Sequence, residues 1–252
     1  MMIQANGLQF QTGFNGVLGP RGVGKTRLLK HLVGQSQGED SKACYVSREL
    51  EAFHRLTVKE YLCVMAGRKS IADRRVAEQI ELALHHVHMT RLSDRYVGEL
   101  SGLAKSQTLI ARALLDDAHL LLLDQVLCGL SEQERMNIGY TLSEISKDRV
   151  IVLAGDVCEA VEGLYDTVSL LHPEKDAVQV SANTAYSWVE GKVWEYVASE
   201  LPQTEGRLIT AYKTCTDGGV YIREVADDVP QEEVSQVTPT LADAYVWWAA
   251  GQ

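Results

Sequence analysis

Residues 19–26 read Gly19-Pro20-Arg21-Gly22-Val23-Gly24-Lys25-Thr26 and match the pattern G-x-x-x-x-G-K-[S/T]. In such a loop, the glycines let backbone N–H groups curl around an anion at the electropositive beginning of a helix. The lysine reaches the β- and γ-phosphates of a nucleotide, and the hydroxyl residue holds Mg²⁺. The pattern therefore predicts a phosphate-binding loop in which Lys25 binds phosphate and Thr26 binds the metal.

The residues on either side of this loop place it between a strand and a helix. Phe14 to Leu18 form a mainly apolar run that is short enough for a buried strand. After the loop, Leu28, Leu29 and Leu32 recur at helical spacing, which predicts a helix that ends at Gly34. The strand–loop–helix order favours a nucleotide site over a glycine-rich turn that binds nothing. The chain is therefore predicted to bind a nucleoside triphosphate.

Length, composition and charge limit the class of protein. The 252 residues, 46% hydrophobic and 23% charged, suit one large globular domain or one domain with an appendage. The net charge of −10 argues against a nucleic-acid partner, because such partners need clusters of Lys and Arg. No apolar stretch is long enough to cross a bilayer, and we expect no direct membrane span. The odd number and scattered positions of the cysteines predict free thiols: Cys44, Cys63, Cys128, Cys158 and Cys215.

Two later apolar runs are each followed by an aspartate. Leu120 to Leu123 end in Asp124, and Val150 to Ala154 are followed by Asp156. Such runs predict buried parallel strands, whose carboxyl ends form the edge where α/β sheets bind ligands. Further strands are expected at 2–10, 43–46 and 167–171.

Residues 56–97 contain no convincing strand and predict helices instead. One helix is expected from Leu56 through Met65, and a second over about 71–87. The second has an apolar face made of Val76, Ile80, Leu82 and Leu84. Near its end stand three histidines without a Cys or carboxylate at ligand spacing, so an exposed helix end is favoured over a metal site: His85, His86 and His88.

The order of these motifs resembles an ATP-binding-cassette (ABC) ATPase over nearly all of residues 1–180. Besides the phosphate-binding loop, the strongest matches are 56–60, 97–102 with 111–114, and 120–124. The resemblance implies an α/β P-loop NTPase fold, an ABC-type nucleotide-binding domain at 1–180 with a helical subdomain at about 56–105. ATP and Mg²⁺ are the implied ligands, with Thr26 and Asp124 at the metal. The implied nucleotide-binding residues are Gly19, Arg21, Gly22, Gly24, Lys25, Thr26, Arg27, Arg48, Ser101 and Gly102.

Domains of this family work as head-to-tail dimers, in which ATP lies between one phosphate-binding loop and the partner's L-S-G-G-Q helix start. A serine hydroxyl, glycine amides and a helix N-terminus add anion-binding donors there. This chain keeps Leu100-Ser101-Gly102 but has Leu103-Ala104 where the family has Gly-Gln. The expected partner is a second ABC ATPase chain, identical or paralogous.

Four positions depart from the family's catalytic pattern. Gln125 replaces the acid that polarises the attacking water, and an amide cannot take a proton. Asp156 replaces the switch histidine, Arg48 the glutamine that reaches Mg²⁺, and Ser131 an aspartate. Together they predict an impaired catalytic site with Gln125 and Asp156 as its degenerate positions. The alternative is a homodimer that hydrolyses ATP slowly by positioning alone.

The charges of two of these replacements lead to a further expectation. A carboxylate near the γ-phosphate is repulsive unless a counter-charge or a proton neutralises it. Arg48 is always charged, so we expect Arg48 and Asp156 to pair across the nucleotide site.

The last residues have a different composition and predict a small α+β domain at 184–252. All four tryptophans lie there, and their simplest role is a core for a small domain rather than a ligand cage: Trp188, Trp194, Trp247 and Trp248. Strands are expected at 191–197, 208–212 and 220–224, the last two flanking a turn at Asp217-Gly218-Gly219. Thr240 and Asp243 have capping-box spacing before a final helix. The region resembles extensions of ABC-2-type exporter subunits.

The resemblance implies the ATP-binding subunit of an ABC exporter, docked on a separate transmembrane permease subunit. It would be cytoplasmic and peripheral on the inner face of the cell membrane, with weak or partner-dependent ATPase activity. Two alternatives stay open. One is a regulatory ATP-binding module that does not drive transport, and the other is a small P-loop kinase, in which the L-S-G segment would have no use.

Overall fold

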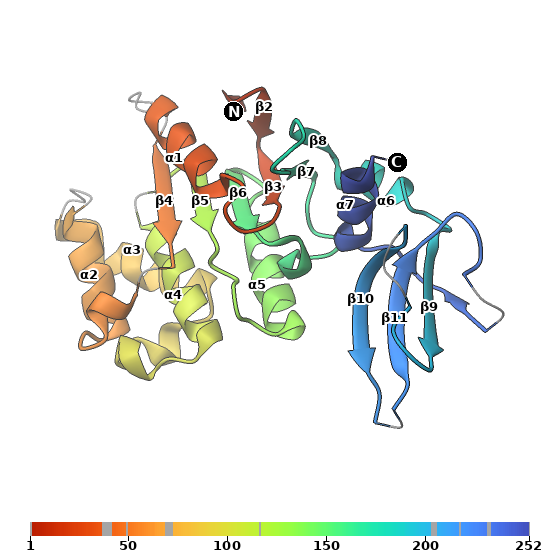
Figure 1. The fold of residues 1–252 in the computed structure, drawn as a ribbon. Helices are drawn as coiled ribbons and strands as arrows, with labels where there is room; N and C mark the ends of the chain where they lie inside the picture. Colours follow the sequence, from red (N-terminus) through yellow and green to blue (C-terminus); the bar gives the residue numbers. More distant parts are fainter. Residues whose placement is uncertain are drawn as a thin grey trace.

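The computed structural model describes residues 2–36, 42–48, 50–68, 73–115, 117–202, 206–216, 218–230 and 233–251. A six-stranded sheet lies at the centre, in the order β4-β5-β6-β3-β7-β8 (Figure 1). Its strands are β3 (Gly13–Leu18), β4 (Ala43–Ser47), β5 (Leu120–Asp124), β6 (Val150–Gly155), β7 (Thr167–Leu170) and β8 (Val178–Ser181). Neighbours run parallel except β7 and β8, which are antiparallel. The sequence predicts β3 to β7 but misses β8.

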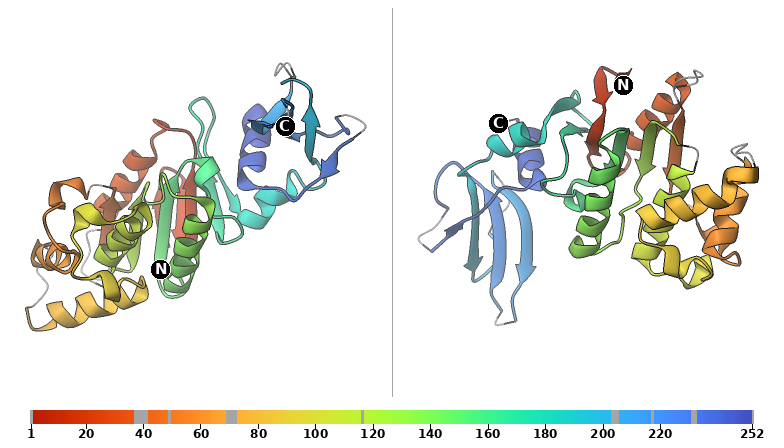
Figure 2. Two further views of the ribbon diagram at one scale, coloured as in Figure 1. Left: turned by 90° about the horizontal axis from the view of Figure 1, so that it is seen from below. Right: turned by 180° about the vertical axis from the view of Figure 1, so that it is seen from behind.

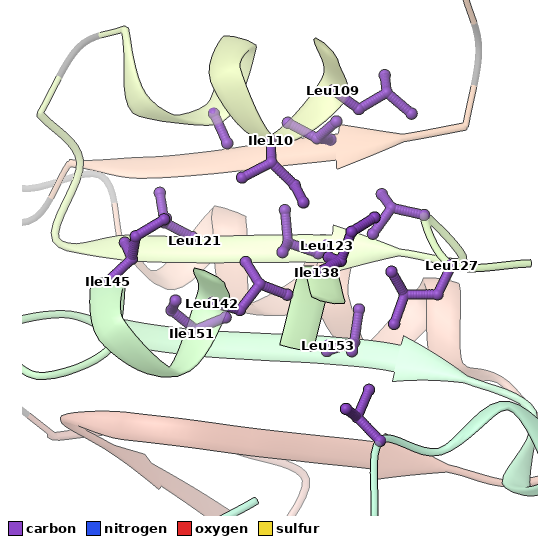
Figure 3. Packing of buried hydrophobic residues seen from close by; sticks show 14 of the residues in the cluster. Leu109, Ile110, Leu121, Leu123, Leu127, Ile138, Leu142, Ile145, Ile151 and Leu153 are labelled. Atoms are coloured by element: carbon purple, nitrogen blue, oxygen red, sulfur yellow. The ribbon is translucent and has the colours of Figure 1, made fainter. Parts of the chain in front are cut away.

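Helices cover both faces of this sheet. Strand β5 is apolar from Leu120 to Leu123 because its side chains meet helices on both faces. Successive strand residues point to opposite faces. Leu120 and Leu122 pack beneath α1 (Lys25–Gln35). Leu121 and Leu123 pack beneath α4 (Gly102–Leu114) and α5 (Glu132–Ile145) (Figure 3). A strand buried on both faces favours a continuous apolar run, which is the pattern of Leu120 to Leu123.

A short hairpin at the N-terminus corrects the single strand expected over 2–10. Strands β1 (Met2–Ala5) and β2 (Leu8–Gln11) pair antiparallel around Asn6 and Gly7. Both turn residues have positive φ, 51° and 80°, as a two-residue hairpin turn requires. Asn-Gly is the strongest short signal for a hairpin turn, so the hairpin could have been predicted from the sequence. Phe10, on β2, is completely buried.

The helical segment contains α2 (Val58–Arg68), α3 (Asp73–His86) and the short helices η1 (Glu51–Phe53), η2 (Thr90–Leu92) and η3 (Val97–Glu99). The predicted first two residues of the second helix, 71 and 72, lie outside the described residues. Ile80 and Leu84 are buried as predicted, but Leu82 is 57% exposed, so its assignment to the apolar face is wrong. Two residues correspond to about 200° around a helix, which turns Leu82 away from Ile80.

The histidines at the end of α3 are exposed, as expected of a solvated helix end. Within the described ranges, no group of three His, Cys, Asp or Glu side chains is arranged to hold a metal ion. In the same ranges, no helix combines the length and the apolar character needed to cross a bilayer.

A second, four-stranded antiparallel sheet follows, in the order β10-β11-β9-β12. Its strands are β9 (Val193–Ala198), β10 (Leu208–Thr214), β11 (Val220–Val225) and β12 (Ser235–Gln236), and its helices are α6 (Ala182–Ser187) and α7 (Leu241–Ala250). The three predicted strands are confirmed, whereas Asp217 of the predicted turn lies outside the described residues. This sheet lies at one end of the molecule and the helical segment at the other (Figure 2). Trp188, Trp247 and Trp248 pack against the main hydrophobic cluster, which supports a structural role.

Helix α7 is fixed to the second sheet by polar contacts. Thr240 and Asp243 form the predicted capping box. Asp243 is completely buried and accepts hydrogen bonds from Arg223 (2.7 Å) and from the Thr210 hydroxyl (2.6 Å). Burial alone would raise the pKa of Asp243, but these hydrogen bonds outweigh it and hold the pKa below its ordinary value. Asp243 therefore stays ionised and keeps Arg223 paired.

The same helix also contacts the segment that follows β6. Glu162 accepts a hydrogen bond from the backbone N–H of Leu241 (3.1 Å) and another from the Tyr186 hydroxyl (2.9 Å). Burial raises the pKa of Glu162 above its ordinary value. Helix α7 also contacts η4 (Val157–Glu159), the single turn directly after Asp156.

Candidate functional site

The loop 19–26 leaves the carboxyl end of β3 and leads into α1, as its sequence predicts. Gly22 and Gly24 have φ of 81° and 104°, a conformation that side chains with a Cβ rarely adopt. A Cβ at Gly19 would lie 2.5 Å from the Leu171 carbonyl oxygen, so only glycine fits there. The glycines therefore set the path of the loop and direct its backbone toward the start of α1.

The side chain of Lys25 lies beneath this loop and is only 3% exposed. Its ammonium donates to the carbonyl oxygens of Gly19 (2.6 Å) and Pro20 (2.8 Å), and to Asp156 Oδ1 (3.2 Å). Two of its partners thus belong to the loop itself. The ammonium is therefore held against the loop, and its contact with phosphate stays a prediction.

The predicted metal residues are brought together at the sheet edge. The Thr26 hydroxyl donates to Asp124 Oδ2 at 2.7 Å. Asp124 is 4% exposed, and its other oxygen, Oδ1, is buried without a hydrogen-bond partner among the described residues. A carboxylate oxygen and a hydroxyl are ligands that Mg²⁺ prefers, and Oδ1 has a lone pair to give. The residues present therefore fit a magnesium ion.

Tyr45, on β4, belongs to this site but was missed by the sequence analysis. Its hydroxyl donates to Asp124 Oδ2 at 2.9 Å, so one carboxylate oxygen accepts both Thr26 and Tyr45. Tyr45 pairs with Leu122 across β4 and β5, and this pairing brings Tyr45 close to Asp124 at the end of β5. No motif marks this tyrosine, because its role depends on strand pairing. It orients the carboxylate and leaves Oδ1 for a cation.

We expect Tyr45→Phe to weaken magnesium-dependent nucleotide binding about 10-fold, since a hydrogen bond to a charged group contributes roughly 1.5 kcal/mol. Affinity should be measured with and without Mg²⁺, and the loss should appear mainly with the metal. Tyr140→Phe, which alters an exposed tyrosine on α5, is the matched control. Unchanged affinity in Tyr45→Phe would show that the hydroxyl does not orient Asp124.

Gln125 lies next to Asp124 in a left-handed conformation, with φ of 55°. With Thr26, Tyr45, Arg48 and Asp124, it lines a cavity of about 370 Å³, and Lys30 and Ser47 complete the wall. The degenerate position predicted from the sequence therefore faces the same space as the metal residues. Its amide can orient water there but cannot accept a proton from it.

The pair expected between Arg48 and Asp156 is replaced by other contacts. Asp156 Oδ1 contacts Lys25, and its Oδ2 accepts from Arg21 Nε at 3.3 Å. Arg48 instead lies beside Gly129, where an added Cβ would be 3.7 Å from its guanidinium. In the chain alone, the pairing of β6 with β3 places Asp156 beside the loop and its two cations. The pair with Arg48, expected when the nucleotide site closes, stays a prediction.

The remaining predicted residues lie on helices. Arg27 is exposed on the first turn of α1. Ser101 caps α4 by accepting from the Ala104 backbone N–H at 3.3 Å, and both Ser101 and Gly102 are exposed. Ser131, at the family's aspartate position, caps α5 in a capping box with Glu134.

Comparison with known proteins identifies the family that the motif order resembles. Residues 9–127 match the family model described as ABC transporter. Similar curated proteins include Nod factor export ATP-binding protein I of Rhizobium sp. (strain N33), 29% identical over 66% of this chain and 62% of the relative. Another is the spermidine/putrescine import ATP-binding protein PotA of Chromobacterium violaceum, 31% identical over 52% of this chain and 41% of the relative. The zinc uptake system ATP-binding protein ZurA of Listeria monocytogenes is 30% identical over 56% of this chain and 63% of the relative. The chain thus matches less than two thirds of the length of each.

Solved structures share the fold. A nucleotide-free ATP-binding cassette from an ABC transporter matches with a TM-score of 0.59 at 17% identity, covering 69% of this chain and 83% of that one. The structure of cbiO1 from Clostridium perfringens, part of the ABC transporter complex cbiONQ, matches with a TM-score of 0.61 at 18% identity, covering 72% and 83%. The α/β fold expected from the sequence is confirmed. The curated relatives include import and export proteins, so they do not single out the exporter group.

Proposed function

Since residues 9–127 are an ABC transporter family domain, we propose that this chain is the ATP-binding subunit of an ABC transporter. The observation that carries the proposal is the meeting of Lys25, Thr26 and Asp124 at one sheet edge, with Asp124 Oδ1 unpartnered among the described residues. The ammonium suits phosphate, and the two oxygens suit Mg²⁺. Magnesium would supply positive charge that neutralises the phosphates. The protein's own residues bind and orient the nucleotide.

On this proposal the chain has two parts, a nucleotide-binding domain at 1–180 and an accessory domain at 184–252. The separate six- and four-stranded sheets support the division. The helical subdomain, about 56–105, carries apolar side chains that remain exposed on α2 and α3, Val64 at 40% and Leu82 at 57%. These fit contact with a transmembrane permease subunit, which would hold the chain on the cytoplasmic face of the cell membrane.

The proposed dimer uses the beginning of α4. Ser101 and Gly102 are exposed there, at the N-terminus of a 13-residue helix, and can face the nucleotide of a second chain, identical or paralogous. Within one chain, Gln125 and Asp156 leave the site without a carboxylate base or the switch histidine. We therefore propose that its own hydrolysis is impaired. The exporter assignment rests on the resemblance of the C-terminal region.

The test is copurification of the tagged full-length chain from detergent-solubilised membranes, with and without Mg-ATP. A transporter subunit is expected to bind Mg-ATP and to bring down a multi-span membrane protein and a second ABC chain. Binding of Mg-ATP without any membrane partner would favour the alternative, a regulatory module that does not drive transport. Absence of nucleotide binding would contradict both.

A further inference from the structure

The contacts of Lys25 use every donor that its side chain has. An ammonium group carries three N–H donors and no acceptor. Two donors go to Gly19 and Pro20, and the third goes to Asp156. A phosphate oxygen can gain a hydrogen bond from Lys25 only if one of these contacts is broken. The two carbonyls belong to the loop, so the contact that a side-chain rotation can release is the one with Asp156.

The strand pairing places Asp156 at this position. Strands β3 and β6 are parallel neighbours, with Leu18 opposite Gly155. Gly19 and Asp156 therefore leave the sheet side by side. Asp156 then caps η4 in an extended conformation, with φ of −74° and ψ of 152°. Its carboxylate enters the site from a fixed backbone position.

Asp156 bridges two cations of the phosphate-binding loop. Oδ1 contacts Lys25 and Oδ2 contacts Arg21, which is 77% exposed. The carboxylate side chain is 21% exposed, so solvent screens this charge only in part. The carboxylate thus occupies one donor each of the loop's lysine and arginine, two cations that suit phosphate oxygens.

We propose that Asp156 competes with the γ-phosphate of a nucleoside triphosphate for Lys25 and Arg21. The isolated chain would then favour a nucleoside diphosphate over the triphosphate. This inference rests on the proposed nucleotide site. In loops of this kind, backbone N–H groups hold the inner phosphates. Among the described residues, the Asp156 side chain bonds Arg21 and Lys25 and none of these N–H groups. Lys25 reaches the β- and γ-phosphates alike, but only a triphosphate adds the negative charge of a γ-phosphate, which Asp156 repels. The carboxylate thus weakens the triphosphate more than the diphosphate.

The test uses the full chain and calorimetric titration with Mg-ADP and with a non-hydrolysable Mg-ATP analogue. The native chain should bind Mg-ADP at least as tightly as the analogue. Asp156→Asn keeps the shape and removes the charge. It should tighten analogue binding about 10-fold or more and change Mg-ADP binding less than about 3-fold, as removal of a close like charge requires.

Two further variants separate charge from structure. Asp156→Glu retains the carboxylate and should retain the preference for the diphosphate. Asp227→Asn removes another paired carboxylate, 3.0 Å from Lys192 in the C-terminal region, and should leave both affinities unchanged. Equal effects of Asp156→Asn on both nucleotides, or no effect, would overturn the competition. Failure of every variant and the native chain to bind either nucleotide would instead overturn the nucleotide site itself.

Discussion

Lys25→Ala is expected to abolish measurable nucleotide binding, with a loss of at least about 100-fold in affinity. Lys25 is buried at 3% exposure, and its ammonium is held by the loop carbonyls of Gly19 and Pro20. Charge-assisted hydrogen bonds to phosphate are roughly twice as strong as neutral ones, and an alanine supplies neither the charge nor the donors. The variant would also leave Asp156 opposite Arg21 alone, which increases its repulsion of phosphate.

Equilibrium titration with labelled Mg-ATP measures this loss, and circular dichroism reports whether the variant is folded. Lys147→Ala is the matched control, because Lys147 is an exposed lysine paired with Glu144 on the surface. A folded Lys25→Ala chain with native ATP affinity would show that the phosphate-binding loop does not bind nucleotide.

Restoring two degenerate positions is expected to give the second large effect. Gln125→Glu combined with Asp156→His should raise ATP turnover by about 10²-fold or more, because general-base catalysis contributes roughly 10²–10⁴-fold. Gln125 lines the cavity that also contains Thr26 and Asp124, so a glutamate there would reach the same space. The histidine would also remove the carboxylate from Lys25.

Steady-state phosphate release measures this gain, with Gln133→Glu on the exposed face of α5 as a control for the added charge. The native chain alone is expected to turn over more slowly than about 1 s⁻¹, the lower end of the range of ordinary enzymes. Faster native turnover would contradict the impaired site. A double variant that binds ATP without gaining activity would show that these two positions do not account for the impairment.

Local sequence patterns predicted the loop 19–26 and the strands that lead to Asp124 and Asp156. The loop 19–26 carries its own conformational requirements in its glycines, and the apolar runs before Asp124 and Asp156 identify buried parallel strands. Parallel strands bring their carboxyl ends to one edge, so Lys25, Thr26 and Asp124 could be expected to meet. The structure brings them together as the sequence indicates.

Partners fixed by pairing between distant segments could not be predicted in the same way. Asp156 meets Lys25 because β6 lies beside β3, and the contact joins residues 131 positions apart. Tyr45 reaches Asp124 because β4 lies beside β5, a relation that no local pattern encodes. Strand β8 and helix α6 were missed; α6 has only six residues, and so short a helix gives weak periodicity.

The contacts between α7 and the segment after β6 have a consequence for how the molecule opens. Glu162 bonds the first backbone N–H of α7 and the Tyr186 hydroxyl, and α7 packs against η4. Segments tied by shared burial and hydrogen bonds unfold together as one cooperative unit. The C-terminal helix and the turn that carries Asp156 therefore belong to the same unit of local unfolding. A fluctuation that frays α7 is therefore expected to loosen the backbone that presents the Asp156 carboxylate to Lys25.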